Sequence, residues 1–314
     1  DDYKGDTILV LSGDHLYRMD YRKFIDRHEE TNADVTIGVT AAREEDASGF
    51  GLVKIDDSGR IIEFSEKPKG EALEKMKVDT TLLGLAPEES RHRPFLASMG
   101  IYVFRKELLR RVLNEENAID FGKDLIPGAI SRLNVQAHLF DGYWEDIGTI
   151  GAFYRANMEM TLPLPPFNFF DAEAPMYTRP RYLPGSKLLD CHIQSSIITE
   201  GCIINGATIN DSIIGIRSRI EHGARLEGVL MMGADSYQTL DEMQQDMDRN
   251  HPRIGIGRNC HIRRAIIDKN ARIGSGVRVL NEAGHKELDG DGYYIRDGIV
   301  IIPKNGVLHD GTVI

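Results

Sequence analysis

Two carboxylates follow apolar stretches of the chain, at points where a binding site is expected. Asp14 follows the run Ile8–Leu11, and Asp146 follows a second predicted strand, Val135–Phe140. In sheets flanked by helices, ligands bind beyond the carboxyl ends of the strands. Two carboxylates at such ends can share a hard cation such as Mg²⁺, which takes substrate phosphates as further ligands. Asp14 and Asp146 are therefore a candidate metal pair, although Asp14 also suits a simple turn and Asp146 a helix N-cap.

Four other residues have types that suit a sugar phosphate. In FSEKPKG, Glu66 and Lys67 end a predicted strand, where the Glu can accept from sugar hydroxyls and the Lys can donate to a phosphate. Gly51 and Ser98 are small residues in strand contexts, where the lack of bulk lets a ligand approach closely. The alternative for Glu66 and Lys67 is a solvated strand end without a ligand.

Composition limits the kinds of partner. The chain has 314 residues, is 41% hydrophobic and carries a formal net charge of -11, so it can form two domains and repels nucleic acid and membranes of anionic lipid. A small phosphate-bearing metabolite fits better. Three cysteines in apolar settings, Cys191, Cys202 and Cys260, are expected to be free thiols, which predicts a reducing compartment. The sequence has no signal-peptide pattern and no stretch apolar enough for a membrane span.

The first half of the chain alternates between predicted strands and helices. From residue 6 to about residue 158 the pattern favours an α/β domain, with a mixed, mostly parallel sheet and helices on its faces. The apolar run that begins at Ile8 is typical of a strand covered on both faces. Residues 51–68 predict a hairpin around a Ser58-Gly59 turn. The other predicted elements are strands at 33–42, 95–105 and 135–140 and helices at 21–28 and 106–116.

The second half has a different period. Aliphatic residues recur at steps of about five or six, which is the signature of a β-helix of hexapeptide repeats. They are Leu188, Ile193, Ile198, Ile203, Ile209, Ile214, Ile220 and Leu226, then Ile262, Ile267, Ile273 and Val279, then Ile301, Val307 and Val313. The polar residues 233–253 are expected to form a surface loop. A proline-rich stretch separates the halves, so we predict domains at 1–160 and 188–314 joined by a connector at 161–187.

Eight segments, in their order along the chain, resemble one known family. They are LSGDHLYRMDY, GFGLVKID, FSEKPKGEAL, VDTTLLGL, ASMGIYVF, YWEDIGT, PRYLP and RRAIIDKNARIG. Together they are similar to ADP-glucose pyrophosphorylase, that is, glucose-1-phosphate adenylyltransferase, and most closely to its cyanobacterial and plant branch. The resemblance implies an N-terminally incomplete nucleotidyltransferase domain followed by a left-handed parallel β-helix, assembled as a homo- or hetero-tetramer. It also implies a place in the cytoplasm, or in the plastid stroma of a plant or alga.

The resemblance carries site residues over by motif. It implies that Asp14 is the catalytic, metal-binding aspartate and Asp146 the second Mg²⁺ ligand. Four residues would hold glucose 1-phosphate, with Lys67 acting in catalysis on its phosphate: Gly51, Glu66, Lys67 and Ser98. In the β-helix, Lys269 of IIDKNARIG and Lys304 of IIPKNG match lysines that bind a phosphorylated activator such as 3-phosphoglycerate. The family's glycine-rich loop, which cradles the ATP phosphates, lies before the point where this sequence begins.

The expected reaction converts ATP and glucose 1-phosphate to ADP-glucose and pyrophosphate, for glycogen or starch synthesis. Two alternatives stay open. One is a catalytically silent regulatory subunit, or a fragment that the absent loop leaves inactive. The other is a β-helix acyltransferase, which predicts a trimer and a catalytic histidine in a coil cleft, with His192, His222 and His261 as candidates.

Overall fold

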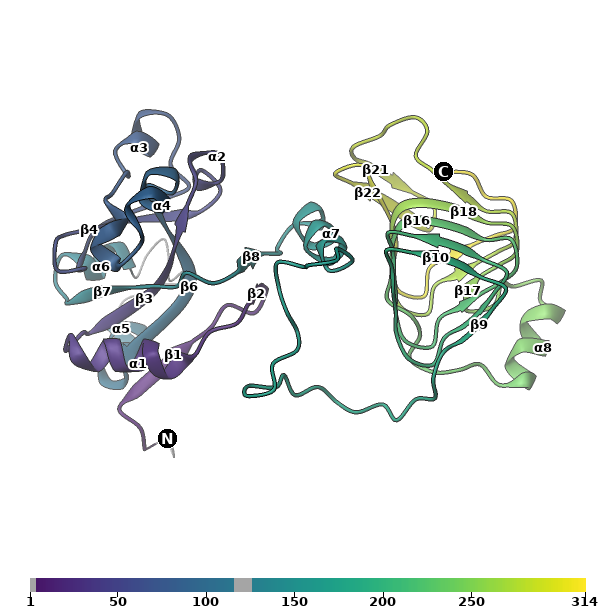
Figure 1. Ribbon diagram of the computed structural model, residues 1–314, viewed down its shortest axis with the longest axis horizontal. Helices are drawn as coiled ribbons and strands as arrows, with labels where there is room; N and C mark the ends of the chain where they lie inside the picture. Colours follow the sequence, from purple (N-terminus) through teal and green to yellow (C-terminus); the bar gives the residue numbers. More distant parts are fainter. Residues whose placement is uncertain (1–3, 116–125) are drawn as a thin grey trace. The chain divides into compact units, whose positions relative to one another are not determined.

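The chain forms two compact units, which a computed structural model describes for residues 4–115 and 126–314. The first unit is Asp1–Trp144 and the second is Glu145–Ile314 (Figure 1). The units therefore divide at Trp144, ahead of the domain end predicted at residue 160. No helix among the described residues is long and apolar enough to cross a membrane. The three cysteines are free, and burial raises the pKa of the Cys260 thiol to about 11.

The first unit is built on a mixed sheet. Its strand order is β5-β4-β6-β3-β7, with β1 also paired to β6. Among the described strands of this sheet, only β3 and β7 pair in parallel, so the expectation of a mostly parallel sheet is wrong: β1, β3 and β4 all run antiparallel to β6, and β4 and β5 form the predicted hairpin. The strands are β1 (Thr7–Val10), β3 (Val35–Ala42), β4 (Gly51–Ile55), β5 (Ile61–Glu66), β6 (Phe95–Arg105) and β7 (Val135–Leu139).

Helices cover both faces of this sheet. Side chains of β6 alternate between the faces, and Met99 and Ile101 pack with Phe24 of α1 (Tyr21–Glu30). On the other face Phe104 packs with residues of α5 (Lys106–Glu115) and α6 (Ile126–Ile130). β1 is only half-buried along its length, so it is not the fully covered strand that its apolar run predicts. The shorter elements are α2 (Glu44–Ala47), α3 (Glu71–Glu74), η1 (Thr80–Leu83) and α4 (Pro87–His92).

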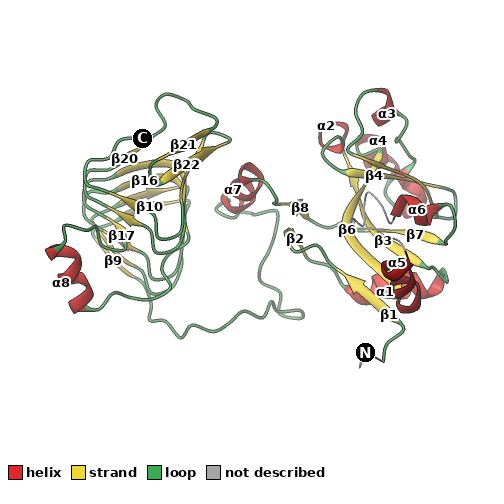
Figure 2. Ribbon diagram, turned by 180° about the vertical axis from the view of Figure 1, so that it is seen from behind, coloured by secondary structure: helices red, strands yellow, loops and turns green. Residues whose placement is uncertain are grey.

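The second unit is a parallel β-helix whose coils stack in register (Figure 2). One face stacks β9 (Lys187–Leu189), β12 (Ile203–Asn205), β15 (Arg219–Ile220), β17 (Gly255–Ile256), β19 (Arg272–Ile273) and β24 (Val307–Leu308). A second face stacks β10 (His192–Gln194), β13 (Thr208–Asn210), β16 (Arg225–Met231), β18 (His261–Ile267) and β20 (Arg278–Val279). A third joins β11 (Ile197–Ile198), β14 (Ile213–Ile214), the ends of β16 and β18, and β23 (Ile299–Ile302).

Each face buries one column of aliphatic side chains, as the period predicts. One column is Ile198, Ile214, Met231, Ile267 and Ile302, aligned residue by residue across the coils. Three predicted positions are wrong by one residue, because in each case the adjacent aliphatic side chain is the buried one: Ile204 in place of Ile203, Ile302 in place of Ile301, and Leu308 in place of Val307. Val313 is 67% exposed and Leu188 is 46% exposed, so neither is the core residue that the period predicts.

Two excursions leave the coil. The first, residues 233–253, contains a helix, α8 (Leu240–Asp248), where the sequence predicts only a loop (Figure 2). Its start is fixed by a capping box, because Thr239 and Glu242 exchange side-chain and backbone hydrogen bonds. The second excursion is an antiparallel hairpin of β21 (Leu288–Gly290) and β22 (Tyr293–Arg296).

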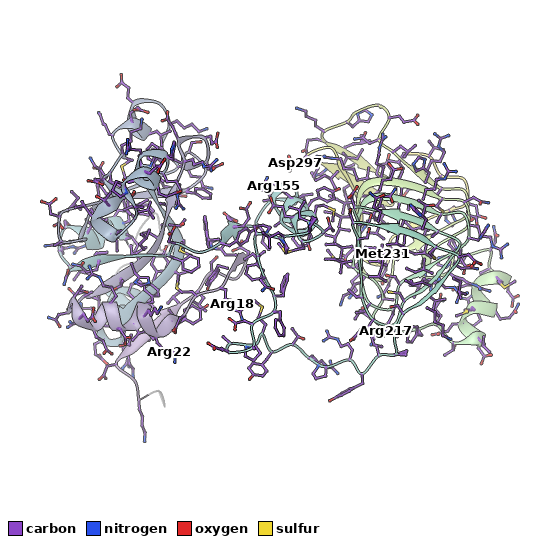
Figure 3. The ribbon with its side chains drawn as sticks, in the orientation of Figure 1. Arg18, Arg22, Arg155, Arg217, Met231 and Asp297 are labelled. Carbon is purple, nitrogen blue, oxygen red and sulfur yellow. The ribbon has the colours of Figure 1, made fainter. Side chains whose placement is uncertain are left out.

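A helix that the sequence assigns to the first domain packs on the β-helix instead. This helix, α7 (Ile150–Glu159), contributes Phe153 and other apolar residues to a core with three buried β-helix residues, Leu230, Ile266 and Ile299. The Tyr154 hydroxyl donates to the backbone carbonyl of Gly228 over 2.6 Å. At the start of the helix the Gly151 amide donates to Asp297, beside α7 in Figure 3, over 3.1 Å. These contacts explain why the units divide before α7.

Candidate functional site

Asp14 lies in the turn between β1 and β2 (His15–Tyr17) with its carboxylate open to solvent. The Ser12 hydroxyl donates to its Oδ1 over 2.7 Å, and this hydrogen bond is the main cause that holds the pKa of Asp14 below its usual value. The side chain is 64% exposed, and among the described residues its Oδ2 accepts no hydrogen bond. An ionised carboxylate with an open oxygen has the chemistry that a hard cation requires.

His15 and Trp144 form a contact beside Asp14 that sequence analysis did not find. Trp144 Nε1 donates to His15 Nδ1 over 3.3 Å, so the proton of the neutral imidazole resides on Nε2, which lies 3.7 Å from Asp14 Oδ1. The Trp144 ring also contacts Phe50, with ring centroids 5.2 Å apart. The sequence position of these two residues could have indicated the contact. His15 directly follows Asp14, and Trp144 opens β8 (Trp144–Asp146), the strand that carries Asp146.

An irregularity in β6 brings Ser98 next to the Asp14 turn. The β3–β6 register shifts near Ile37, and Gly100 adopts a positive φ of 65°. A Cβ on Gly100 would lie 3.4 Å from His15 Cε1, so the turn rests directly on this glycine. Ser98 Oγ accepts from the Gly100 amide over 3.4 Å. Ser98 and the Asp14 turn therefore both contact Gly100.

The hairpin end presents the predicted sugar-phosphate residues together. Gly51 pairs with Glu66, and a Cβ on Gly51 would lie 2.7 Å from the Phe64 ring and 2.8 Å from Glu66 Oε2, so a larger residue here would force both side chains to shift. Lys67 follows in the left-handed region, with φ 46°, and its amide donates to the Phe50 carbonyl over 3.1 Å. Both charged side chains are exposed, and within the described chain neither makes a hydrogen bond or ion pair. Phe50 thus links Lys67, through Trp144, to the Asp14 turn.

Asp146 lies in the second unit and does not cap α7. Its Oδ1 accepts from the Gly148 amide over 2.9 Å, whereas the helix is capped by Thr149, whose Oγ1 accepts from the Ala152 amide over 3.2 Å. The N-cap interpretation of Asp146 is therefore wrong. Its pairing with Asp14 stays a prediction. Within residues 4–115 and 126–314, no three His, Cys, Asp or Glu side chains cluster as a metal site. Mg²⁺ held by one or two carboxylates takes water and substrate oxygens as its other ligands.

Lys269 and Lys304, which are far apart in sequence, meet at one carboxylate in the β-helix. The Lys269 ammonium lies 3.2 Å from Asp235 Oδ1, and the Lys304 ammonium lies 3.2 Å from Asp235 Oδ2. Asn270 also donates to Asp235 Oδ2 over 3.0 Å. The two predicted effector lysines are thus brought together, and Asp235, which sequence analysis did not single out, holds them.

Comparison with protein-family models assigns each part of the chain. A nucleotidyl transferase model matches residues 1–162, which is more than half of the chain. The chain belongs to the nucleotidyl transferase family. A second model, the GLGC left-handed parallel β-helix domain, matches residues 181–313 of this transferase. A nucleotidyl transferase domain followed by this β-helix is the architecture of ADP-glucose pyrophosphorylase, so the resemblance is confirmed, and so is the predicted fold class apart from the strand directions of the first sheet.

The histidines considered for an acyltransferase have structural roles or lie exposed in the transferase. A Cβ on Gly206 would lie 2.0 Å from His222 Nδ1, so the His222 ring stacks directly on the coil above it. His192 is exposed on an edge strand. His261 Nε2 lies 3.9 Å from Glu227, its neighbour on the coil surface. The nucleotidyl transferase match accounts for the first unit, which an acyltransferase does not require.

Proposed function

We propose that this nucleotidyl transferase is a glucose-1-phosphate adenylyltransferase, which converts ATP and glucose 1-phosphate to ADP-glucose and pyrophosphate for glycogen or starch synthesis. The observation that carries the proposal is the union of a nucleotidyl transferase domain with a GLGC-type β-helix in one chain. The grouping of Gly51, Glu66 and Lys67 at one strand end supports a sugar phosphate as the acceptor.

The proposed chemistry needs no general base. The nucleophile is a phosphate oxygen of glucose 1-phosphate, which is already anionic at neutral pH, so the protein has to position the substrates and neutralise charge. Asp14 and Asp146 would hold Mg²⁺, whose charge, when it is bound, stabilises the nucleotide phosphates during transfer. The Ser12 hydrogen bond and the nearby His15 Nε2 keep Asp14 ionised and oriented for that task.

Lys67 and its neighbours would hold the acceptor. The left-handed backbone of Lys67 and its amide bond to Phe50 fix the point from which the ammonium reaches a phosphate. Lysine binds phosphate as a compact point charge and offsets its repulsion from the triphosphate. Glu66 would accept from sugar hydroxyls, while Gly51 and Ser98 leave space for the ring.

The same proposal includes regulation, assembly and location. Lys269 and Lys304 would bind a phosphorylated effector such as 3-phosphoglycerate, because two ammonium groups at one point are suited to a phosphate. The transferase would act as a homo- or hetero-tetramer in the cytoplasm, or in the plastid stroma of a plant or alga.

The test is a substrate panel on the purified chain. ATP, UTP, GTP and dTTP are each paired with glucose 1-phosphate and Mg²⁺, and the nucleotide sugar and pyrophosphate are measured. We expect ADP-glucose as the main product. A preference for UTP or dTTP would contradict the proposal. Binding of glucose 1-phosphate without turnover would support the silent regulatory subunit, or the inactive fragment, instead.

A further inference from the structure

The two lysines occupy equivalent positions on neighbouring coils. Lys269 follows Ile267 and Lys304 follows Ile302, and these two isoleucines are aligned in the β18–β23 ladder. Strands in such a ladder lie about 4.8 Å apart, so coil stacking fixes the spacing of the two side-chain origins. Both ammonium groups turn toward Asp235, which belongs to neither coil turn but to the excursion that follows Met231, labelled in Figure 3.

Asp235 is held at this point by a reciprocal pair of bonds with Asn270. The Asn270 amide group donates to Asp235 Oδ2 over 3.0 Å, and the Asp235 backbone amide donates to Asn270 Oδ1 over 2.8 Å. Asn270, then Lys304 and Lys269, lower the pKa of Asp235 to about 2. The carboxylate is therefore ionised throughout the physiological pH range, and mild acid does not release the lysines.

The two lysines form an anion-binding site that is already occupied by the carboxylate of Asp235, a residue of the same chain. Each carboxylate oxygen takes one ammonium group, as two oxygens of a bound phosphate would. A phosphate monoester carries more negative charge than a carboxylate and offers more acceptor oxygens, so it can replace Asp235 on both lysines. We propose that Asp235 is a built-in competitor for the effector site, and that a phosphate-bearing effector binds by displacing it. This inference rests on the effector site of the proposed function.

Displacement has a defined structural consequence. Asp235 lies near the start of the excursion that carries α8, and its release frees the backbone only at Asp235 and Ser236. Tyr237 stays bonded to the Gly201 carbonyl, and the Gln238 side chain stays bonded to the Ile254 amide. The helix itself stays attached, because Arg272 donates to Asp246 over 2.7 Å and to the Pro252 carbonyl over 2.6 Å. Effector binding is therefore expected to loosen only the first residues of the excursion.

The first experiment measures binding directly, without catalysis. Inorganic phosphate and 3-phosphoglycerate are titrated by calorimetry into the full chain and into Asp235→Asn, which keeps the size of the side chain but removes its charge. Exposed ion pairs contribute little individually, so we expect the variant to bind about three- to tenfold tighter. Asp241→Asn is the matched control, because it removes the same charge from α8, where Asp241 makes no hydrogen bond or ion pair within the described chain.

The outcomes separate the proposals. Tighter binding in Asp235→Asn but not in Asp241→Asn supports the competitor role, and a gain for 3-phosphoglycerate alone assigns the site to the phosphorylated acid over free phosphate. Weaker or unchanged binding in Asp235→Asn overturns it, because Asp235 would then merely orient the lysines or anchor the loop. Since neither measurement uses turnover, failure of ADP-glucose synthesis in the substrate panel leaves this test intact.

Hydrogen exchange gives a second readout that a purely structural anchor would not share. In the natural chain, saturation with 3-phosphoglycerate should speed amide exchange at residues 235 and 236, since displacement breaks the bond from the Asp235 amide to Asn270, and leave α8 protected. In Asp235→Asn these amides should exchange fast already and respond little to the ligand. Slower or unchanged exchange at residues 235 and 236 in the natural chain on ligand binding would overturn displacement.

Discussion

The sheet unit and the β-helix present their functional side chains in opposite ways. In the sheet unit each is placed by a departure from regular geometry: Gly100 interrupts β6, Lys67 is left-handed after β5, and Gly51 makes room for Glu66. In the β-helix, Lys269 and Lys304 are placed by repetition of one coil position. A site built from such irregularities should fail when any one of them is removed. In the stacked site, removal of one lysine leaves the other lysine in place.

The largest expected effect is at Asp14, the proposed catalytic metal ligand. Asp14→Asn should lower kcat by about a thousandfold or more with a modest change in the KM for glucose 1-phosphate, because a lost metal ligand removes mainly transition-state stabilisation. Turnover at saturating Mg²⁺ is the measurement, with Asp57→Asn as a control in an exposed turn of the same unit. Near-normal turnover would remove Asp14 from the site.

Lys67 tests whether the hairpin end holds the acceptor. Lys67→Ala should raise the KM for glucose 1-phosphate by about a hundredfold, and that for ATP far less, since the ammonium grips one substrate in both ground and transition states. Initial rates with each substrate varied in turn give the two values. Lys69→Ala, also exposed and close by, is the control. Equal changes for both substrates would argue against direct contact.

The stacked lysines should give smaller and similar effects. Lys269→Ala and Lys304→Ala should each raise the half-activating concentration of 3-phosphoglycerate by about tenfold, equivalent to about 1.4 kcal/mol. Each variant keeps the other lysine at the same carboxylate, so the double variant should be worse than either. Activator titrations at fixed substrate measure this. Unchanged titrations would return both residues to ordinary solvated lysines.

The smallest expected effect comes from comparing two glycines that have similar positive φ angles. Gly100 and Gly276 have φ of 65° and 68°, but a Cβ would contact the Asp14 turn at Gly100 and meet no atom within 4 Å at Gly276. Alanine at either position should cost about 1 kcal/mol or more of unfolding free energy through backbone strain. Only Gly100→Ala should also lower kcat. Thermal unfolding and turnover of both variants test this, and equal kcat values would contradict the role of the β6 irregularity.

Repetition is also what made the β-helix predictable from sequence. A period of six residues identifies the coil because every coil repeats it, but it does not fix the phase where two aliphatic residues are adjacent. Ile203 and Ile204 are such a pair, and only the stacking of neighbouring coils decides that Ile204 is buried. The helix α8 was missed although the Thr239–Glu242 capping box was visible as a short motif.

The strands and helices of the sheet unit could be predicted from sequence, but the directions in which the strands pair could not. The hairpin and β6 lie where their apolar patterns place them, but strand direction depends on contacts between distant segments, which a single sequence does not encode locally. The same holds for the sites. Asp14 and Lys67 were found by type and motif, whereas the Trp144–His15 contact and Asp235 depend on residues separated by 129 and 34 positions.

The packing of α7 on the β-helix decides how the second unit can be isolated. A shortened chain that starts in the proline-rich segment, at residue 161, would lose the residues that cover Leu230, Ile266 and Ile299. Such a piece would expose an apolar patch on one face of the β-helix and should aggregate or self-associate when expressed. A piece that starts at Glu145 retains its own cover, including the Tyr154 anchor to Gly228. The second unit is therefore longer than its repeats.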